Sequence, residues 1–224
     1  MKHIVLFDLD ETIGYFQNIS ALFNQEISIN PLASKTMIIH NLLRTSPDAF
    51  RPGIFELFNI ILRGKKSNPN IIVALFTNNQ GPKYWYNAII SYINSMYTYK
   101  LFDQVIGPYK INGVRVEPQR KSHNKSIKDI SKILGTNTTS DKYIFFDDQY
   151  HSKMSHKNVE YVHIAQYIPG IKSVDEFKAD AKEMIKKLSF FLNKSIKIKR
   201  VKGGSRRKKI NKNKKTRKRK NKCN

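Results

Sequence analysis

Short, uninterrupted hydrophobic runs recur along the chain, and the clearest of them stop abruptly at polar residues. Three such runs occupy residues 4–7, 71–76 and 143–146. They end at Asp8, at Thr77 and at Asp147, respectively. Runs of this length are typical of strands buried on both faces of a parallel sheet, and residues 102–106 and 160–164 are predicted strands too. Because open α/β sheets bind ligands beyond the carboxyl ends of their strands, we expect the polar residues to meet at one edge.

Helical periodicity fills the segments between these strands. The predicted helices cover residues 54–62, 85–96, 127–134 and 174–192. The third of them has Ser126 as its expected N-cap and Gly135 as its expected end. Asn112 followed by Gly113 predicts a hairpin turn. The alternation of strands and helices predicts an α/β fold, with a Rossmann-like parallel sheet and helices on both faces.

Basic residues are concentrated towards the C-terminal end. The 224 residues have a formal net charge of +24, and 17 of the 41 Lys and Arg residues lie in residues 194–224, which contain no Asp or Glu. This asymmetry predicts a folded domain over residues 1–193 and a disordered Lys/Arg-rich tail over residues 194–224. The clusters in residues 205–222 are expected to bind nucleic acid or another polyanion, or to direct the protein to the nucleus. A solubilising tail without a partner stays open.

Cysteine content and the length of the apolar runs indicate the compartment. The single cysteine, Cys223, cannot form an internal disulfide, which agrees with a reducing intracellular environment. The apolar runs are much shorter than the roughly 20 residues that cross a bilayer, and the N-terminal run is too short for a signal peptide. We therefore expect a soluble, intracellular protein with no membrane partner.

Asp8 and Asp10 form an acidic pair directly after a predicted buried strand. Two carboxylates at this spacing repel one another unless a cation lies between them, so the pair indicates a metal site. An isolated Asp-x-Asp is more often a solvated acidic turn that ends a strand. The acids at the end of another predicted strand, Asp147 and Asp148, favour the metal site.

Several segments in the same order and spacing resemble a known family. FDLDET at residues 7–12, LFTNN at 75–79 and FFDD at 145–148 are similar to the first, second and fourth motifs of haloacid-dehalogenase (HAD) superfamily phosphatases. The Glu of the first motif and RPG at residues 51–53 resemble the NLI-interacting-factor-like (FCP/SCP) branch, which acts on the RNA polymerase II C-terminal domain. The resemblance covers about residues 2–164 and implies a HAD-like fold with a small cap or none.

This resemblance implies a magnesium-dependent phosphatase and a role for each matching residue. Asp8 would be the nucleophile that forms an aspartyl-phosphate, and Asp10 would be general acid and then general base. Thr77 would donate its hydroxyl and its backbone N–H to a phosphate oxygen, with Asn78 as a helper. Mg²⁺ would be held by Asp8, by Asp10 through its backbone carbonyl, by Asp147 and by Asp148.

The family also uses a lysine that contacts both the nucleophile and the phosphate. Lys121, Lys125 and Lys128 all precede the fourth motif. Lys125 fits best because it comes directly before the capping residue Ser126. Lys128 fits if KDIS at residues 128–131 is compared with the Lys-Asp-Leu-Ser of the polymerase-directed enzymes. In a chain this basic, each of these lysines is also a candidate for a solvated surface charge, so composition does not decide between them.

Three functions remain open at this point. The first is dephosphorylation of phosphoserine or phosphothreonine in proteins, because the short segments between the motifs predict an open site that suits a phosphoprotein substrate. The second is a polynucleotide 3′-phosphatase, since TNNQ at residues 77–80 is similar to the Thr-Asn-Gln of those enzymes, although Glu11 departs from their Asp-Gly-Thr. The third is a catalytically silent, nucleic-acid-binding scaffold that keeps the fold.

Overall fold

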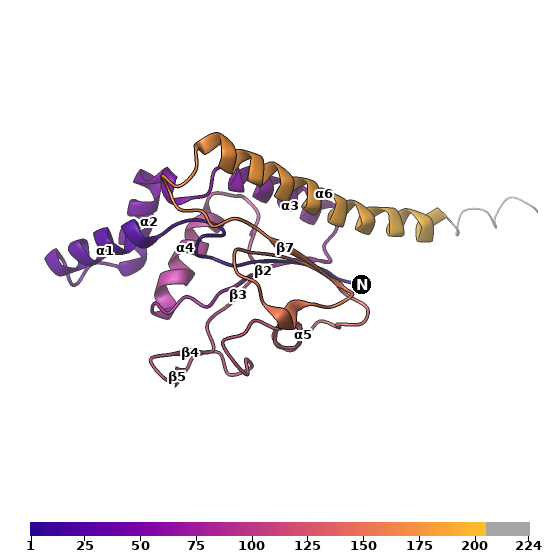
Figure 1. Ribbon diagram of the computed structural model, residues 1–224, viewed down its shortest axis with the longest axis horizontal. Coiled ribbons are helices and arrows are strands. Elements are labelled where there is room, and N and C mark those ends of the chain that lie inside the picture. Colours follow the sequence, from indigo (N-terminus) through magenta and orange to yellow (C-terminus); the bar gives the residue numbers. More distant parts are fainter. Residues whose placement is uncertain (205–224) are drawn as a thin grey trace, which may run out of the picture.

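A five-stranded sheet forms the centre of the protein (Figure 1). The structure is a computed structural model that describes residues 1–204, with side chains described for residues 1–193. Every neighbouring pair of strands is parallel. The order across the sheet is β3 (Gln104–Ile106), β2 (Ile71–Phe76), β1 (His3–Phe7), β6 (Lys142–Asp147) and β7 (Val159–His163). All five predicted strands are confirmed.

The central position of β1 determines which residues meet at the carboxyl edge of the sheet. Phe7, the last residue of β1, lies opposite Leu75 of β2 and Phe146 of β6. Asp8 therefore leaves the sheet beside Asp147, the last residue of β6. The parallel arrangement predicted from the buried apolar runs thus brings the first and fourth motifs side by side.

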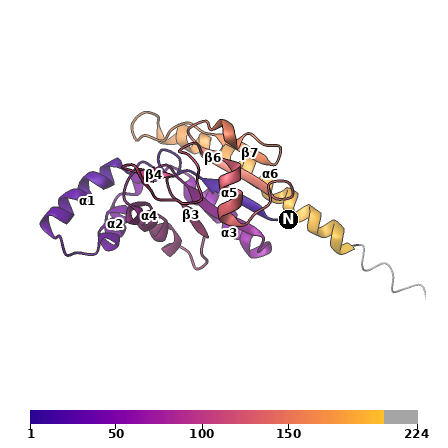
Figure 2. The ribbon, with the colours of Figure 1, turned by 90° about the horizontal axis from the view of Figure 1, so that it is seen from below.

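Helices cover both faces of the sheet, as the sequence predicted. They are α1 (Gln17–Ile29), α2 (Lys35–Thr45), α3 (Ile54–Ser67), α4 (Lys83–Ser95), α5 (Ile127–Leu134) and α6 (Val174–Gly204), with short 3₁₀ turns η1 (Pro47–Ala49) and η2 (Ser152–Met154). Buried residues of α5 pack on one face, whereas those of α3, α4 and α6 pack on the other. Figures 1 and 2 show α1 and α2 at one end of the molecule.

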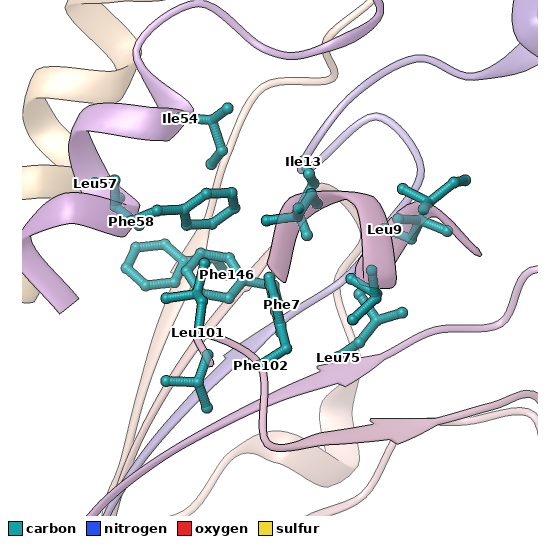
Figure 3. Packing of buried hydrophobic residues seen from close by; sticks show 14 of the residues in the cluster. Phe7, Leu9, Ile13, Ile54, Leu57, Phe58, Leu75, Leu101, Phe102 and Phe146 are labelled. Atoms are coloured by element: carbon teal, nitrogen blue, oxygen red, sulfur yellow. The ribbon is translucent and has the colours of Figure 1, made fainter. Parts of the chain in front are cut away.

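Alternating side chains of β1 build the two halves of the core. Val5 and Phe7 point to the face that α3, α4 and α6 cover, and Ile4 and Leu6 point to the face of α5. The ring of Phe7 lies 5.0 Å from that of Phe146 and 5.6 Å from that of Phe58, centroid to centroid (Figure 3). Full burial of each such side chain contributes about 1.5–3 kcal/mol. This packing fixes the end of β1 from which Asp8 projects.

Local signals in the sequence also produce the structures that they predict. The Ser126 hydroxyl accepts a hydrogen bond from the Asp129 backbone N–H at 3.1 Å, and Gly135 ends α5 with a φ of 58°. Asn112 and Gly113 have φ values of 48° and 81°, as a type I′ turn requires. The hairpin on this turn pairs β4 (Lys110–Ile111) with β5 (Val114–Arg115).

Two segments differ from the expectations drawn from the sequence. Residues 15–46, for which no helix was predicted, contain α1 and α2. The last helix, α6, was expected to end near residue 192 but continues to Gly204, past the predicted domain boundary. The predicted basic tail covers residues 194–224, and its residues 205–224 lie outside the described residues. Among the helices of the described residues, none is long and apolar enough to cross a membrane.

Candidate active site

Buried carboxylates gather where β1 and β6 end. Asp8, Asp147 and Asp148 each place a carboxylate oxygen within 4.8 Å of the others, and all three residues are buried. These acids come from two segments that are almost 140 residues apart in the sequence and adjacent in the sheet. The meeting of the first and fourth motifs at one edge, expected from the strand ends, is therefore present in the structure.

Lys125 lies between two of these acids. Its Nζ donates to Asp8 Oδ1 and, at 2.7 Å, to Asp147 Oδ2, and only 2% of its side chain is exposed. The ammonium also lies 5.3 Å from the ring centroid of Phe145. A buried lysine with two carboxylate partners is held in one position, because withdrawing it would leave charges unpaired in a low-dielectric site.

The other two lysines considered from the sequence do not reach the acids. Lys121 and Lys128 are exposed, and neither contacts Asp8 or Asp147 in the described part of the chain. Lys125 comes immediately before the N-cap of α5, so the start of that helix positions it. The structure thereby favours the lysine that fitted the capping pattern best, and its catalytic role stays a prediction.

The charges of the acid cluster fit a divalent cation. Asp8, Asp147 and Asp148 carry three negative charges when ionised, and the Lys125 ammonium compensates one of them. Three carboxylates that converge within 4.8 Å provide the hard oxygen donors that Mg²⁺ prefers. The side chain of Asp10 is not part of this cluster, and its expected contribution through the backbone carbonyl stays a prediction.

The two acids that contact Lys125 have different proton affinities. Burial raises the pKa of Asp8 to about 7, although the Lys125 ammonium opposes the rise. Burial acts in the same direction on Asp147, but the adjacent His151 side chain and the charge of Lys125 hold its pKa below its usual range. His151 Nε2 lies 3.5 Å from Asp147 Oδ2. Without a cation, Asp8 is therefore the acid of this pair that takes up a proton first.

Asp10 points to a different set of groups. Its Oδ2 accepts a hydrogen bond from Asn79 Nδ2 at 2.8 Å. Burial raises the pKa of Asp10, and the hydrogen bond from Asn79 lowers it in part. A carboxyl group with a raised pKa is suited to hold a proton and donate it, which agrees with the predicted general acid. Asn79 belongs to one of the matching motifs, but no role was predicted for it.

Asp148 is held by Thr12, in the loop after β1, and by Gln166, which follows β7. The Thr12 hydroxyl donates to Asp148 Oδ1 at 3.1 Å, and Gln166 Nε2 donates to Asp148 Oδ2 at 3.2 Å. Arg51 fastens the same loop, since its Nε donates to the Thr12 carbonyl at 2.7 Å and its Nη2 to the Glu11 carbonyl at 2.6 Å. Glu11 has a φ of 55°, a conformation that a non-glycine residue keeps only with such support.

Thr77 and Asn78 are braced by an arginine that the sequence analysis did not single out. Arg120 is fully buried and donates to the Thr77 carbonyl at 3.0 Å and to Asn78 Oδ1 at 2.7 Å. The Thr77 backbone N–H donates to the Ile106 carbonyl at 3.0 Å, so the expectation that this N–H serves a phosphate is wrong. The Thr77 hydroxyl accepts from the Asn79 N–H, which leaves its own proton for a ligand. Phosphate binding by Thr77 and Asn78 stays a prediction.

No protein-family model matches the chain, and no curated protein matches it. Two solved structures that resemble it are of the HAD domain of effector protein Lem4 from Legionella pneumophila. The first has a TM-score of 0.46 and 14% identity over 80% of this chain and 93% of that chain. The second, an inactive mutant, has a TM-score of 0.47 and 12% identity over 87% and 98%. At TM-scores below 0.5, this likeness carries no argument about the fold or the function of the chain.

Proposed function

We propose that the protein is a magnesium-dependent phosphatase that hydrolyses phosphate monoesters through an aspartyl-phosphate intermediate. The observation that carries this proposal is the group formed by Asp8, Asp147 and Asp148, with the Lys125 ammonium bonded to the first two. A catalytically silent scaffold would gain nothing from three buried acids with one compensating ammonium, because unpaired buried charge is destabilising. The resemblance to HAD phosphatases, and to their FCP/SCP branch, supports the proposal from the sequence.

In the first half of the reaction, an oxygen of the Asp8 carboxylate attacks phosphorus and the bond from phosphorus to the ester oxygen breaks. Asp10 donates its proton to the departing oxygen, so the leaving group departs as an alcohol. Lys125 holds the Asp8 carboxylate in place and lies where a phosphate oxygen would approach. Mg²⁺, when bound by the acid cluster, would offset the repulsion between the carboxylate and the phosphate.

In the second half, water attacks the phosphorus of the aspartyl-phosphate and the bond to Asp8 breaks. Asp10, now ionised, takes the proton from this water and thereby returns to its starting state. Inorganic phosphate leaves. The same residue thus acts as acid and then as base, which requires a carboxyl group whose pKa is raised from its usual value, as burial raises that of Asp10.

Phosphate release from p-nitrophenyl phosphate by the full-length chain tests this proposal. With Mg²⁺ present we expect turnover, and Asp8→Asn lowers kcat by roughly three orders of magnitude or more. Asp175→Asn, the same substitution at an exposed acid of α6, serves as the matched control and keeps wild-type turnover. Turnover by Asp8→Asn at the wild-type rate removes Asp8 as nucleophile. No turnover by the wild type, together with measurable Mg²⁺ binding, favours the scaffold.

The leaving group distinguishes the two candidate substrate classes. Phosphoserine or phosphothreonine in a protein stays the substrate predicted from the sequence. A specific observation favours the second candidate, a 3′-phosphorylated nucleic acid: a cavity lined by aromatic and amide side chains lies beside Asp10. A phosphoserine peptide and a 3′-phosphorylated oligonucleotide, compared under identical conditions, separate the two.

A further inference from the structure

A cavity of about 240 Å³ opens beside the predicted general acid. Asp10 and Asn79 line it together with residues of α1 and of the start of α4. Drug-sized ligands occupy sites of about 300–1,000 Å³, so this cavity has room for one ring system and not for a large molecule. Because Asp10 would protonate the leaving oxygen, the group attached to that oxygen would extend into this cavity.

Aromatic side chains form one wall of the cavity. The ring of Phe23 lies 5.9 Å from that of Trp85 and 6.0 Å from that of Tyr84, centroid to centroid. Phe23 and Trp85 are buried, and Tyr84 is half-buried and lines the same space. An aromatic wall of this kind favours a planar ligand that stacks on it.

Several other residues that line the cavity are polar and uncharged. Gln17, Ser20 and Asn24 lie on one side of α1, since they are three and four residues apart, and all three line the cavity. In the part of the chain that the structure describes, the Ser20 hydroxyl and the Asn24 amide have no hydrogen-bond partner in the protein. Their donors and acceptors are therefore free to bind the edge of a planar ligand.

The charges near this cavity favour an anionic ligand. The Lys35 ammonium lies 4.7 Å from the ring centroid of Tyr84. Residues 1–193, without the basic tail, contain 24 Lys and Arg against 17 Asp and Glu. A nucleotide matches an aromatic wall, uncharged polar groups and a nearby ammonium, because it joins a planar, uncharged, hydrogen-bonding base to a negatively charged phosphate. Few peptide side chains offer all three features.

We propose that the cavity between α1 and α4 binds the base of a nucleotide whose 3′-phosphate faces Asp8. The inference rests on the proposed phosphatase and names its substrate class. Tyr84 stacks on the base, and Ser20 and Asn24 bond its edge. A free nucleotide and the 3′ end of a nucleic acid present the same chemistry to the cavity.

Ligand binding to an inactive variant tests the cavity without depending on catalysis. Trp85 is the single tryptophan of the chain, so its fluorescence reports directly on the cavity. In Asp8→Asn we expect adenosine 3′-monophosphate to change this fluorescence and to bind roughly 5- to 150-fold more tightly than glycerol phosphate, the range that stacking supplies. Equal binding of the two phosphates overturns the inference.

Kinetics with a filled cavity provide the second test. Ser20→Phe places a ring in the cavity, and Leu22→Phe adds the same ring on the exposed side of α1. We expect the ratio of kcat/KM for adenosine 3′-monophosphate to that for glycerol phosphate to fall at least about 5-fold in Ser20→Phe, and to keep its wild-type value in Leu22→Phe. The same ratio in both variants overturns the inference.

The outcomes separate this inference from the phosphatase proposal. If adenosine 3′-monophosphate binds more tightly than glycerol phosphate but no phosphate ester is hydrolysed, the phosphatase proposal is contradicted and the inference about the cavity is supported. Equal hydrolysis of both phosphates supports the phosphatase and contradicts the cavity. Another outcome is that the wild type prefers a phosphoserine peptide and that Ser20→Phe abolishes this preference. This result assigns the cavity to a peptide and overturns the inference. A preference for either a 3′-phosphorylated oligonucleotide or the mononucleotide supports the inference. The preferred ligand shows whether the base comes from a nucleic acid or from a free nucleotide.

Discussion

Replacing Lys125 by methionine removes the ammonium group that lies between Asp8 and Asp147 while keeping most of the volume of the side chain. Breaking a buried ion pair by removing one partner costs about 3–5 kcal/mol, because the remaining charge is left uncompensated. Here two acids lose their partner at once. For a protein of this size, 1 kcal/mol corresponds to about 2–4 °C in Tm, so we expect a decrease of roughly 6–20 °C near pH 8.

The loss depends on pH in a direction that the pKa of Asp8 determines. In the wild type this pKa is raised to about 7, and Lys125 opposes the rise. Without Lys125 the pKa of Asp8 rises further, and each unit corresponds to about 1.4 kcal/mol. A raised carboxyl pKa means that the folded state binds the proton more tightly than the unfolded state, so stability falls as pH rises towards the folded pKa. The penalty of Lys125→Met is therefore smaller at pH 5, where Asp8 is protonated, than at pH 8.

Urea denaturation at pH 5 and at pH 8 measures both effects. Lys121→Met and Lys128→Met are matched controls, because these exposed lysines lie four residues before and three residues after Lys125. Each control is expected to change the free energy of unfolding by no more than about 0.5 kcal/mol. A Lys125→Met variant that is as stable as the controls at pH 8, or that loses more stability at pH 5 than at pH 8, refutes the reasoning.

Three further predictions concern the surroundings of the site. Asn79→Leu removes the hydrogen bond that lowers the pKa of Asp10, so this pKa rises. The alkaline limb of the profile of kcat against pH therefore moves to higher pH. A limb that stays in place or moves to lower pH contradicts the role of Asp10 as general acid. Arg51→Met leaves buried carbonyls without a donor and lowers the free energy of unfolding by about 3 kcal/mol or more, whereas Arg44→Met on exposed α2 changes it little; equal urea midpoints speak against the brace. Deleting residues 205–224 lowers kcat/KM for a 3′-phosphorylated oligonucleotide at low salt only, and a loss that persists at high salt excludes an electrostatic tether.

The strands could be predicted because each buried strand is a continuous apolar run with a sharp polar end. Continuous apolar runs of this kind favour parallel strands, and in the structure the register of β1 with β6 brings Asp8 beside Asp147. The cap at Ser126 and the αL residue Gly135 are local signals that need no tertiary contact to be recognised. These features belong to short segments, and short segments are visible in a single sequence.

The helices of residues 15–46 left a weaker signal. In α1 only Ile19 and Phe23 are fully buried, and in α2 only Ile39 and Leu43. Each pair has the i, i+4 spacing of a helix, but two apolar positions do not distinguish a helix from a loop. Because these helices were not predicted, an open site was expected. In the structure, α1 forms one wall of a cavity beside Asp10.

The bracing role of Arg51 and Arg120 could not be identified from the sequence, although Arg51 belongs to the matching segment RPG at residues 51–53. The partners of Arg120 include the carbonyl of Thr77, and those of Arg51 include the carbonyl of Thr12. Every residue has a carbonyl, so a distant backbone acceptor leaves no mark on residue type. The choice among three lysines was limited in the same way, because the position of Lys125 depends on how α5 packs against the sheet.

Covalent phosphate on Asp8 is the most direct test of the account. The full-length chain is mixed with Mg²⁺ and a phosphate monoester, quenched rapidly in acid, and digested for mass spectrometry. We predict phosphate on the peptide that contains Asp8, and its absence from the same peptide of Asp8→Asn. Substrate turnover without a phosphorylated peptide, or with phosphate on another residue, would contradict the role that we propose for Asp8.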